Sequence, residues 1–339
     1  MNKNATLSVT YLASHGVHQI LTRDINAPLP GTYPFGDPSV GERPYENYGN
    51  VTNVGQIYQF ESAGIFNQNQ VITNFNLRMG AKLMLFGFYT LSYANANTSS
   101  PMNPYDIAQD YGRAGFDIRH RVFLGGNWNL PHGFAVSPFI VLNSSAPFNI
   151  TLKGVDLYGT ANYFNDRPAL ASSGESGSNI FNTRWGTFNA APGPNDKMIG
   201  PNYGTGPGQF TANLRVAKTF GFGKKPEGPG SSRAQGGGPG GGPGGGGRGG
   251  GGGYGPGLGG RGLGGGGGAG GLFGPGSTNA RYSLTISANA RNVFNNVNLS
   301  PPYGVLGTNY FGRSNSLVGG FFSSAAANRR IDFQVMFNF

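Results

Sequence analysis

The sequence contains no cysteine, and this absence removes several classes of site at once. Without a thiol among its 339 residues, the chain has no disulfide framework, no thiolate zinc site and no catalytic cysteine. Charged residues are scarce as well, at 11%, where soluble domains usually have about a quarter. The polar surface therefore comes from Asn, Ser, Thr and Gln, which suits a barrel lumen and its loops better than a cytosolic enzyme.

Long apolar runs are missing too, and this bears on how the chain could meet a membrane. No stretch of about twenty apolar residues occurs, which excludes a transmembrane helix. Residues 1–6 lead directly into an alternating pattern, without the apolar segment of a signal peptide. Because an exported protein needs such a segment, we expect this chain to be the C-terminal part of a longer protein.

Patterns for catalysis and for metal binding are also absent from the sequence. His15 and His18 are three residues apart, which places them on opposite faces of a strand, and His120 and His132 are isolated. The sequence has no nucleophile elbow, phosphate-binding loop or metalloprotease motif. We therefore predict that the protein is not an enzyme and that it uses no metal or cofactor.

The last eleven residues carry the clearest structural signal that is present. Along Arg329–Phe339, apolar residues alternate with mostly polar ones, and this period of two is typical of a β-strand with one apolar face. The apolar face consists of Ile331, Phe333, Val335, Phe337 and Phe339. Such a strand fits the core of a soluble β-sandwich, or a transmembrane barrel in which this face contacts lipid.

Comparable patterns along the chain predict about eight strands joined by connections of alternating length. We expect strands at residues 5–12, 55–78, 83–93, 116–130, 134–151, 209–222, 281–292 and 329–339. The long connections lie near residues 16–54, 95–115, 153–205 and 297–327, and the minimal ones at 79–82 and 131–133. Long loops on one side and tight turns on the other are typical of outer-membrane barrels with up-and-down strands.

Large aromatic residues gather near the side of the tight turns, where a membrane interface would lie. They are Trp128, Phe134, Phe220, Phe222, Tyr282, Phe337 and Phe339. Ordinary core aromatics at strand ends are the alternative interpretation. Together with the alternating connections, this grouping favours an all-β, antiparallel transmembrane barrel fragment with long extracellular loops.

A glycine-rich segment interrupts the pattern where a short turn is expected. Between Gly236 and Gly276, about 29 of 41 residues are glycine. The segment has too few apolar residues to offset the backbone entropy lost on folding, so we predict that it is disordered. The chain then divides into strands one to six at 1–222, a periplasmic insertion at 223–279 and the last two strands at 280–339. Arg248 and Arg261 resemble arginine–glycine RNA-binding segments, but with so few charges we predict no nucleic-acid partner.

Three charged residues near the fourth strand form a candidate site. Asp117, Arg119 and Arg121 are spaced by two, which would place them on one face of the expected strand at 116–130. One interpretation is a ladder of charges that faces the barrel lumen. The other is an ion pair with a purely structural role.

Several segments resemble the C-terminal half of TonB-dependent outer-membrane transporters, in particular the Oar-like group of Acidobacteria-type bacteria. The segments that carry the resemblance are Leu7–Leu12, Arg23–Gly31, Asp117–Arg121, Ala290–Asn295, Phe311–Ser314 and Asn328–Asp332. The resemblance spans most of the chain outside the glycine-rich segment. Its motifs are habits of sequence in that family and include no ligand-binding residue.

The resemblance implies a part of a barrel of about 22 strands with a plugged lumen, in the outer membrane of a Gram-negative cell. This chain would be the last eight strands of the wall, in contact with lipid and with the barrel assembly machinery through the strand that ends at Phe339. The intact protein would take up a bulky nutrient, and contact with the TonB system would need a plug that this sequence lacks. The alternatives are a self-contained small barrel, as an anchor or pore, and a soluble surface or adhesive β protein.

Overall fold

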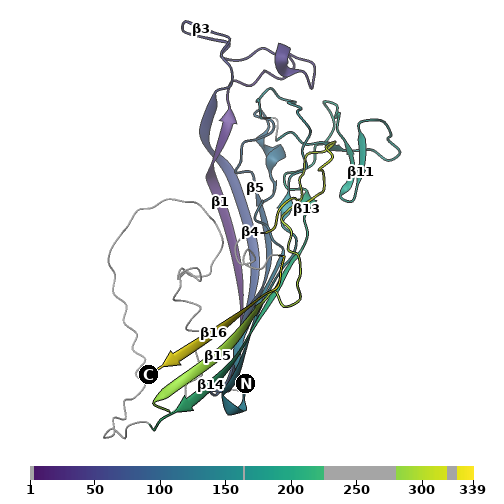
Figure 1. Cartoon of the computed structure of the whole chain (residues 1–339). Coiled ribbons are helices and arrows are strands. Elements are labelled where there is room, and N and C mark those ends of the chain that lie inside the picture. The colour runs from purple at the N-terminus through teal and green to yellow at the C-terminus, as the bar shows by residue number, and fades with distance from the viewer. Residues whose placement is uncertain (1–3, 163–164, 225–279, 319–326) are drawn as a thin grey trace.

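One large antiparallel sheet makes up most of the computed structural model, which describes residues 4–162, 165–224, 280–318 and 327–339 (Figure 1). Its long strands are β1 (Ala5–Asp24), β4 (Tyr58–Met79), β5 (Leu83–Ala96), β7 (His120–Asn129), β8 (Phe134–Asn143), β14 (Gln209–Phe222), β15 (Tyr282–Arg291) and β16 (Arg330–Asn338). They lie side by side in sequence order, and each is antiparallel to the next. The predicted all-β, up-and-down sheet of about eight strands is confirmed.

The sheet is open within the described part of the chain. At one end of the strand order, β1 pairs with β4 alone, and at the other end β16 pairs with β15 alone. The substantial contacts of each long strand are with its hydrogen-bonded neighbours, so no strand packs against another across the interior. Figure 1 shows the result as a curved wall with two edges.

The tight turns lie at one end of this wall and the long connections at the other (Figure 1). The turn between β4 and β5 has Gly80 at φ 56°, in the left-handed region that glycine enters at low cost. The turn between β7 and β8 is a short 3₁₀ segment, η3 (Pro131–Gly133). Both minimal connections were predicted at these positions, and both predictions are confirmed.

The first connection was predicted wrongly, because the first strand is much longer than eight residues. β1 continues through Asp24 and pairs with β4 on both sides of a break at Val17 and His18, so no loop begins at Gly16. The alternation is broken by a β-bulge between Gly16 and Ile20, where His18 has φ 57°. A period of two cannot be followed through such a break, which hid the upper half of the strand.

Two other strand boundaries also differ from the prediction. β7 begins at His120 instead of Phe116, because Asp117 closes a local turn with its own backbone N–H bonded to the Ala114 carbonyl. β8 ends at Asn143, and Pro147 lies in β9 (Pro147–Phe148), which pairs with β13 (Gly204–Thr205). The residues after Asn143 leave the main sheet for this second ladder in the loop layer, whereas Pro138 stays inside β8 opposite Leu214.

The long connections form a folded layer above the sheet, called here the loop layer: the described residues of 25–57, 97–119, 144–208 and 292–329. Its small strands, besides β9 and β13, are β2 (Asn47–Tyr48), β3 (Val51–Thr52), β6 (Gly112–Arg113), β10 (Ala169–Leu170), β11 (Ile180–Thr183) and β12 (Gly186–Asn189). Its 3₁₀ segments are η1 (Pro38–Val40) and η2 (Ile107–Asp110). The segment at 153–205, expected to be a plain polar loop, thus contains a small sheet. The glycine-rich residues 236–276 lie outside the described residues.

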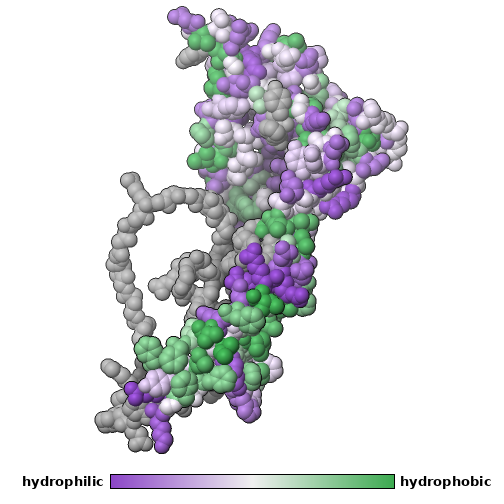
Figure 2. Space-filling view, in the orientation of Figure 1, coloured by the Kyte–Doolittle hydropathy of each residue, from purple (hydrophilic) through white to green (hydrophobic). Residues whose placement is uncertain are grey.

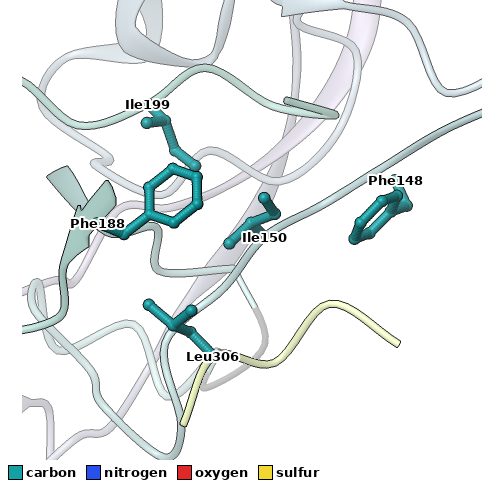
Figure 3. Packing of buried hydrophobic residues seen from close by; sticks show 5 residues of the cluster. All are labelled: Phe148, Ile150, Phe188, Ile199 and Leu306. Carbon is teal, nitrogen blue, oxygen red and sulfur yellow. The ribbon is translucent and has the colours of Figure 1, made fainter. Parts of the chain in front are cut away.

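The loop layer has an apolar core of its own. The buried cluster consists of Phe148, Ile150, Phe188, Ile199 and Leu306 (Figure 3). Four of them come from the connection at 144–208 and Leu306 comes from the one at 292–329, so the core ties two of the long loops together. Trp185 covers the cluster, with its ring 5.1 Å from that of Phe148 and 5.5 Å from that of Phe311.

Candidate membrane-facing wall and lumen

The five apolar residues of the last strand share one face of the wall, called here the outer face. Ile331, Phe333, Val335, Phe337 and Phe339 have exposed fractions of 56, 79, 66, 50 and 94%. In β15 the residues directly opposite are also apolar: Ala288 faces Phe333, Ile286 faces Val335 and Leu284 faces Phe337. Because opposite residues of an antiparallel pair lie on the same face, the apolar surface is continuous across the two strands.

The same outer face is apolar on the other long strands. On β1, Leu7, Val9 and Tyr11 are 65–69% exposed, far more than large apolar side chains of a water-soluble surface usually are. Further exposed members of this face are Val71, Phe75, Tyr89, Tyr93, Leu142, Val216 and Ile286. Figure 2 shows apolar side chains gathered on the lower part of the wall, over β14 to β16. In water this surface would be costly, whereas lipid solvates it.

Aromatic rings concentrate on the outer face near the tight turns, as the sequence predicted. Phe222 lies 5.9 Å from the rings of both Tyr282 and Phe337, and Phe337 lies 6.1 Å from Phe339. A cation joins them: Lys218 Nζ is 4.0 Å from the centre of the Phe134 ring and bonds to the carbonyl of the adjacent turn. A long lysine that reaches the strand ends beside aromatic rings is typical of a membrane interface.

The inner face, formed by the alternate residues, is mostly polar. The Ser92 hydroxyl accepts hydrogen bonds from the side-chain amides of Gln68 and Gln70, at 3.3 and 3.1 Å. Farther along the wall, the hydroxyls of Thr219 and Thr285 lie 3.0 Å apart. These side chains are buried and paired with each other, so they cost little in desolvation. A polar interior opposite an apolar exterior is the arrangement of a barrel wall.

One part of the inner face is aromatic, which the sequence did not reveal. The Phe123 ring lies 5.8 Å from Phe86, 5.5 Å from Phe88 and 5.2 Å from Phe139. The cluster covers Gly125, where an added Cβ would lie only 3.0 Å from the Phe86 ring. Residues 83–93 are apolar on both faces, and this double pattern was the one available sign of an apolar lumen patch.

The three charged residues of the candidate ladder occupy different positions. Asp117 is fully buried and lies in the turn before β7, where its carboxylate accepts bonds from Arg113 Nε at 2.8 Å and Arg119 Nε at 2.9 Å. The same carboxylate accepts the Ala94 amide at 3.0 Å, which fixes the turn to β5. The expectation that Asp117 and Arg119 share a strand face with Arg121 is corrected, because β7 begins after them.

Arg121 differs from the other two residues of this set. It lies on β7 opposite Asn143 of β8 and Thr90 of β5, on the inner face. One guanidinium nitrogen donates to the Phe116 carbonyl at 3.3 Å, while its buried Nε has no hydrogen-bond partner in the described part of the chain. The ion pair between Arg113 and Asp117 was not predicted from the sequence, because Arg113 lies in β6, outside the strand in which residues spaced by two were compared. A lumen role for these charges stays a prediction.

A second buried ion pair lies in the loop layer. Arg167 and Asp110, both 2% exposed in their side chains, are 2.7 Å apart, and Arg167 Nε also donates to the Ile199 carbonyl at 2.8 Å. Asp166 lies beside this pair, and its carboxylate accepts the Leu157 amide at 3.2 Å. Burial, with Asp156 nearby, raises the pKa of Asp166 to about 7. Nothing in the sequence pointed to this group.

The described residues hold no cluster suited to binding a metal ion. Across 4–162, 165–224, 280–318 and 327–339, no three His, Asp or Glu side chains come together as a metal site. A hollow of about 240 Å³ lies at the tight-turn end, and Arg78 lines it together with apolar side chains and two asparagines. No helix within those ranges has the length and apolar character needed to span a bilayer.

Comparison with known proteins identifies the class of this wall. Residues 1–226 match the model of a family described as outer membrane beta barrel domain. The chain belongs to this family. The outer membrane beta barrel domain accounts for the apolar outer face and the polar inner face, and it places the protein in the outer membrane. Members of this family are typically not enzymes.

A solved outer-membrane protein has a distantly similar structure. The outer membrane transporter YddB from Escherichia coli aligns over 99% of this chain and 30% of its own, with a TM-score of 0.41 and 10% sequence identity. The outer membrane beta barrel domain described here thus spans less than a third of the YddB chain. No curated protein matches the sequence.

Proposed function

We propose that this chain forms part of the wall of a TonB-dependent, Oar-like outer-membrane transporter that takes up a bulky nutrient such as an oligosaccharide or a peptide. The observation that carries the proposal is the open sheet, whose outer face is apolar and whose two end strands each lack a partner on one side in the part of the chain that the structure describes. A backbone edge in lipid costs several kcal/mol for each group left without a hydrogen bond. The wall is therefore completed by other strands.

The long strands supply the membrane-spanning surface in this proposal. A barrel strand needs about 9–11 residues to cross the hydrocarbon region, and each of the eight long strands has at least nine. The polar inner face then borders the transport path, and the loop layer faces the outside of the cell. Nutrient specificity would belong to loops and to a plug that these 339 residues do not include.

Two partners follow from the same proposal. The barrel assembly machinery would recognise β16, whose outer-face side chains end with Phe339 at the tight-turn side. The TonB system would act through the plug and would make no contact with this wall. The chain alone is then expected to be incompetent for transport, with no catalytic role.

The proposal is tested by expressing the full chain in the outer membrane of a Gram-negative host. We expect recovery in the membrane fraction, no shift in gel mobility on heating in detergent, and no pore conductance in planar bilayers, because an open wall encloses no channel. Heat-modifiable mobility together with conductance would instead show a self-contained barrel. Recovery in the soluble fraction without detergent would show a soluble surface protein.

A further inference from the structure

Two tyrosines of the outer face carry polar partners at the ends of β5 and β7 that lie away from the tight turns. Tyr93 is 47% exposed, and Cζ of Arg119 lies 4.1 Å from the centre of its ring. Beside it, the Tyr89 hydroxyl is 2.8 Å from Nδ1 of His120, and the two rings are stacked. These four residues are called here the boundary site. We propose that the boundary site binds the phosphate group of a glycolipid in the outer leaflet, an inference that rests on the orientation of the wall given in the proposed function.

The boundary site lies where the apolar band of the outer face ends. β7 has 10 residues, with Trp128 near the tight turn and His120 at the other end. Ten residues extend about 33 Å along a strand and, at a tilt of about 40°, roughly 25 Å across the membrane, which is the height of the apolar band of a barrel. At the same level the Tyr11 hydroxyl donates to Asn69 at 2.7 Å, and Asn69 lies opposite Tyr93. Polar side-chain pairs therefore begin at the level where lipid head groups begin.

The boundary site carries an excess of positive charge. The buried carboxylate of Asp117 is shared by Arg113 at 2.8 Å and Arg119 at 2.9 Å, so two cations face one anion. The described strands β5, β7 and β8, which form this part of the wall, contain no Asp or Glu. An anion from outside the sheet can therefore neutralise the excess charge at the edge of the apolar band, where desolvation strengthens the attraction.

Arg119 is positioned to bind a phosphate group. Its Nε is directed to Asp117 and its guanidinium plane is packed on Tyr93, while its side chain stays 34% exposed. Among the described residues, none forms a hydrogen bond with the two terminal nitrogens of Arg119, and such a pair matches two oxygens of a phosphate. When Nδ1 of His120 accepts the Tyr89 hydroxyl proton, Nε2 of the neutral ring is a further donor beside this arginine.

Apolar side chains directly below the boundary site favour a lipid over a soluble anion. On the outer face, Leu91 lies opposite His120, and Val122 lies opposite both Tyr89 and Leu142. Leu142 is 40% exposed. A glycolipid can place its phosphate at Arg119 and its acyl chains along these side chains, whereas a free phosphate would leave them uncovered. Arginine beside aromatic rings at the head-group level is also typical of lipid-binding surfaces.

The test measures lipid binding to the full chain in detergent micelles by native mass spectrometry. The probes are lipid A with both phosphates, lipid A from which both phosphates have been removed, and inorganic phosphate, each with a chelator present so that no divalent cation bridges the groups. We expect the phosphorylated lipid to bind at least about tenfold more tightly than the phosphate-free lipid. Inorganic phosphate at the same concentration should not compete.

An arginine variant locates the bound phosphate. Arg119→Gln should weaken binding of the phosphorylated lipid about tenfold and leave binding of the phosphate-free lipid unchanged, because only the charged contact is lost. Arg184→Gln is the matched control, since Arg184 lies 4.1 Å from the Trp185 ring in the loop layer, away from the boundary site. This control variant should bind both lipids as the unmodified chain does.

A measurement on the unmodified chain decides the question if Arg119→Gln disturbs the turn at Asp117. Phenylglyoxal modifies exposed arginines, and peptide mapping gives the rate of modification at each one. The phosphorylated lipid should slow modification of Arg119 several-fold and leave the rate at Arg184 unchanged. The phosphate-free lipid should slow neither.

Three results would overturn the inference. Equal binding of the two lipids, with Arg119 modified equally fast in both, would show that no head group is bound there. A preference for the phosphorylated lipid that persists in Arg119→Gln would show that the phosphate binds elsewhere and that Arg119 only holds the turn. Shielding of Arg119 by inorganic phosphate alone would show a site for a soluble anion. Failure of the proposed transporter wall is seen separately, as recovery of the chain in the soluble fraction.

Discussion

The long strands and the loop layer bury their apolar side chains in different ways. In the sheet, Phe333 and its neighbours on the outer face stay exposed, as is typical of a barrel wall, in which lipid takes the place of a protein core. In the loop layer, Phe188 and Ile150 are fully buried within one apolar cluster, as in a water-soluble domain. The difference is visible in Figure 2, where the lower wall is apolar at its surface and the upper part is largely polar.

The two regions also treat charge differently. The loop layer buries a paired arginine and aspartate, Arg167 and Asp110, whereas the outer face of the sheet places its lysine, Lys218, at the strand ends beside aromatic rings. One chain therefore combines a region packed like a soluble domain with a region built like a membrane wall. Substitutions in the loop layer and in the sheet should therefore change stability in different ways.

The largest effect is expected for a broken ion pair in the loop layer. Asp110→Asn leaves the Arg167 guanidinium buried without a counter-charge, so the loop layer should lose about 3–5 kcal/mol of stability. Hydrogen exchange at the Leu152 and Ile199 amides measures this loss. The double variant Asp110→Asn/Arg167→Met serves as the control and should cost clearly less. Equal losses in the two variants would mean that the charge pair is not what stabilises the layer.

The stability of the loop layer should also depend on pH, through the carboxyl group of Asp166. Its folded pKa of about 7 is above the ordinary value of 3.8, so the folded layer holds a proton that the unfolded chain releases. The proton on Asp166 contributes its full stabilisation of the folded layer below about pH 4, and this contribution is lost as the pH rises through 7. The loss amounts to at most on the order of 4 kcal/mol. Asp166→Asn should abolish this part of the pH dependence and exceed the wild type in stability at pH 8. Unchanged pH profiles would contradict the assignment.

In the sheet, adjacent residues should differ strongly in how much stability the same substitution removes. Phe333→Arg places a charge in lipid and should cost about 2–4 kcal/mol near the middle of the bilayer. Gln334→Arg, on the polar inner face, should cost much less. Urea titrations of the chain folded into lipid vesicles compare the two variants. Equal costs would indicate that both faces meet water.

The smallest effect is expected at the membrane interface. Lys218→Met removes the cation above the Phe134 ring and should lower stability by about 0.5–1 kcal/mol in the same titrations. Lys218→Arg keeps a cation at the ring and is the matched control. If the arginine variant loses as much as the methionine variant, the contact with the ring contributes nothing.

The sequence predicted the sheet well and the loop layer poorly, for physical reasons. Alternation is a local property, so β14 and β15 were located from their own residues, and the turns followed from the short gaps. The bulge near His18 interrupts the alternation and concealed half of β1. The core around Phe188 joins residues from distant loops, and no local pattern announces such contacts.

The candidate site shows the same division. The apolar face of β16 was predicted residue by residue, because one strand defines it. Asp117 was expected on a strand, yet its buried carboxylate instead gathers Arg113 and Arg119 around a turn. Spacing alone cannot reveal an ion pair whose second arginine comes from another strand. The inner aromatic cluster at Phe123 was missed because it depends on packing across three strands.

The central claim is that the outer face of this wall meets lipid and the inner face meets water. Since the chain has no cysteine, single cysteines at residues 331 to 338 can each carry a nitroxide label in outer-membrane vesicles. Collision rates with oxygen, which is enriched in lipid, and with a water-soluble nickel complex then report the two environments. We predict a period of two, with oxygen access highest at positions 331, 333, 335 and 337. Uniform access of the nickel complex along the strand would contradict the account.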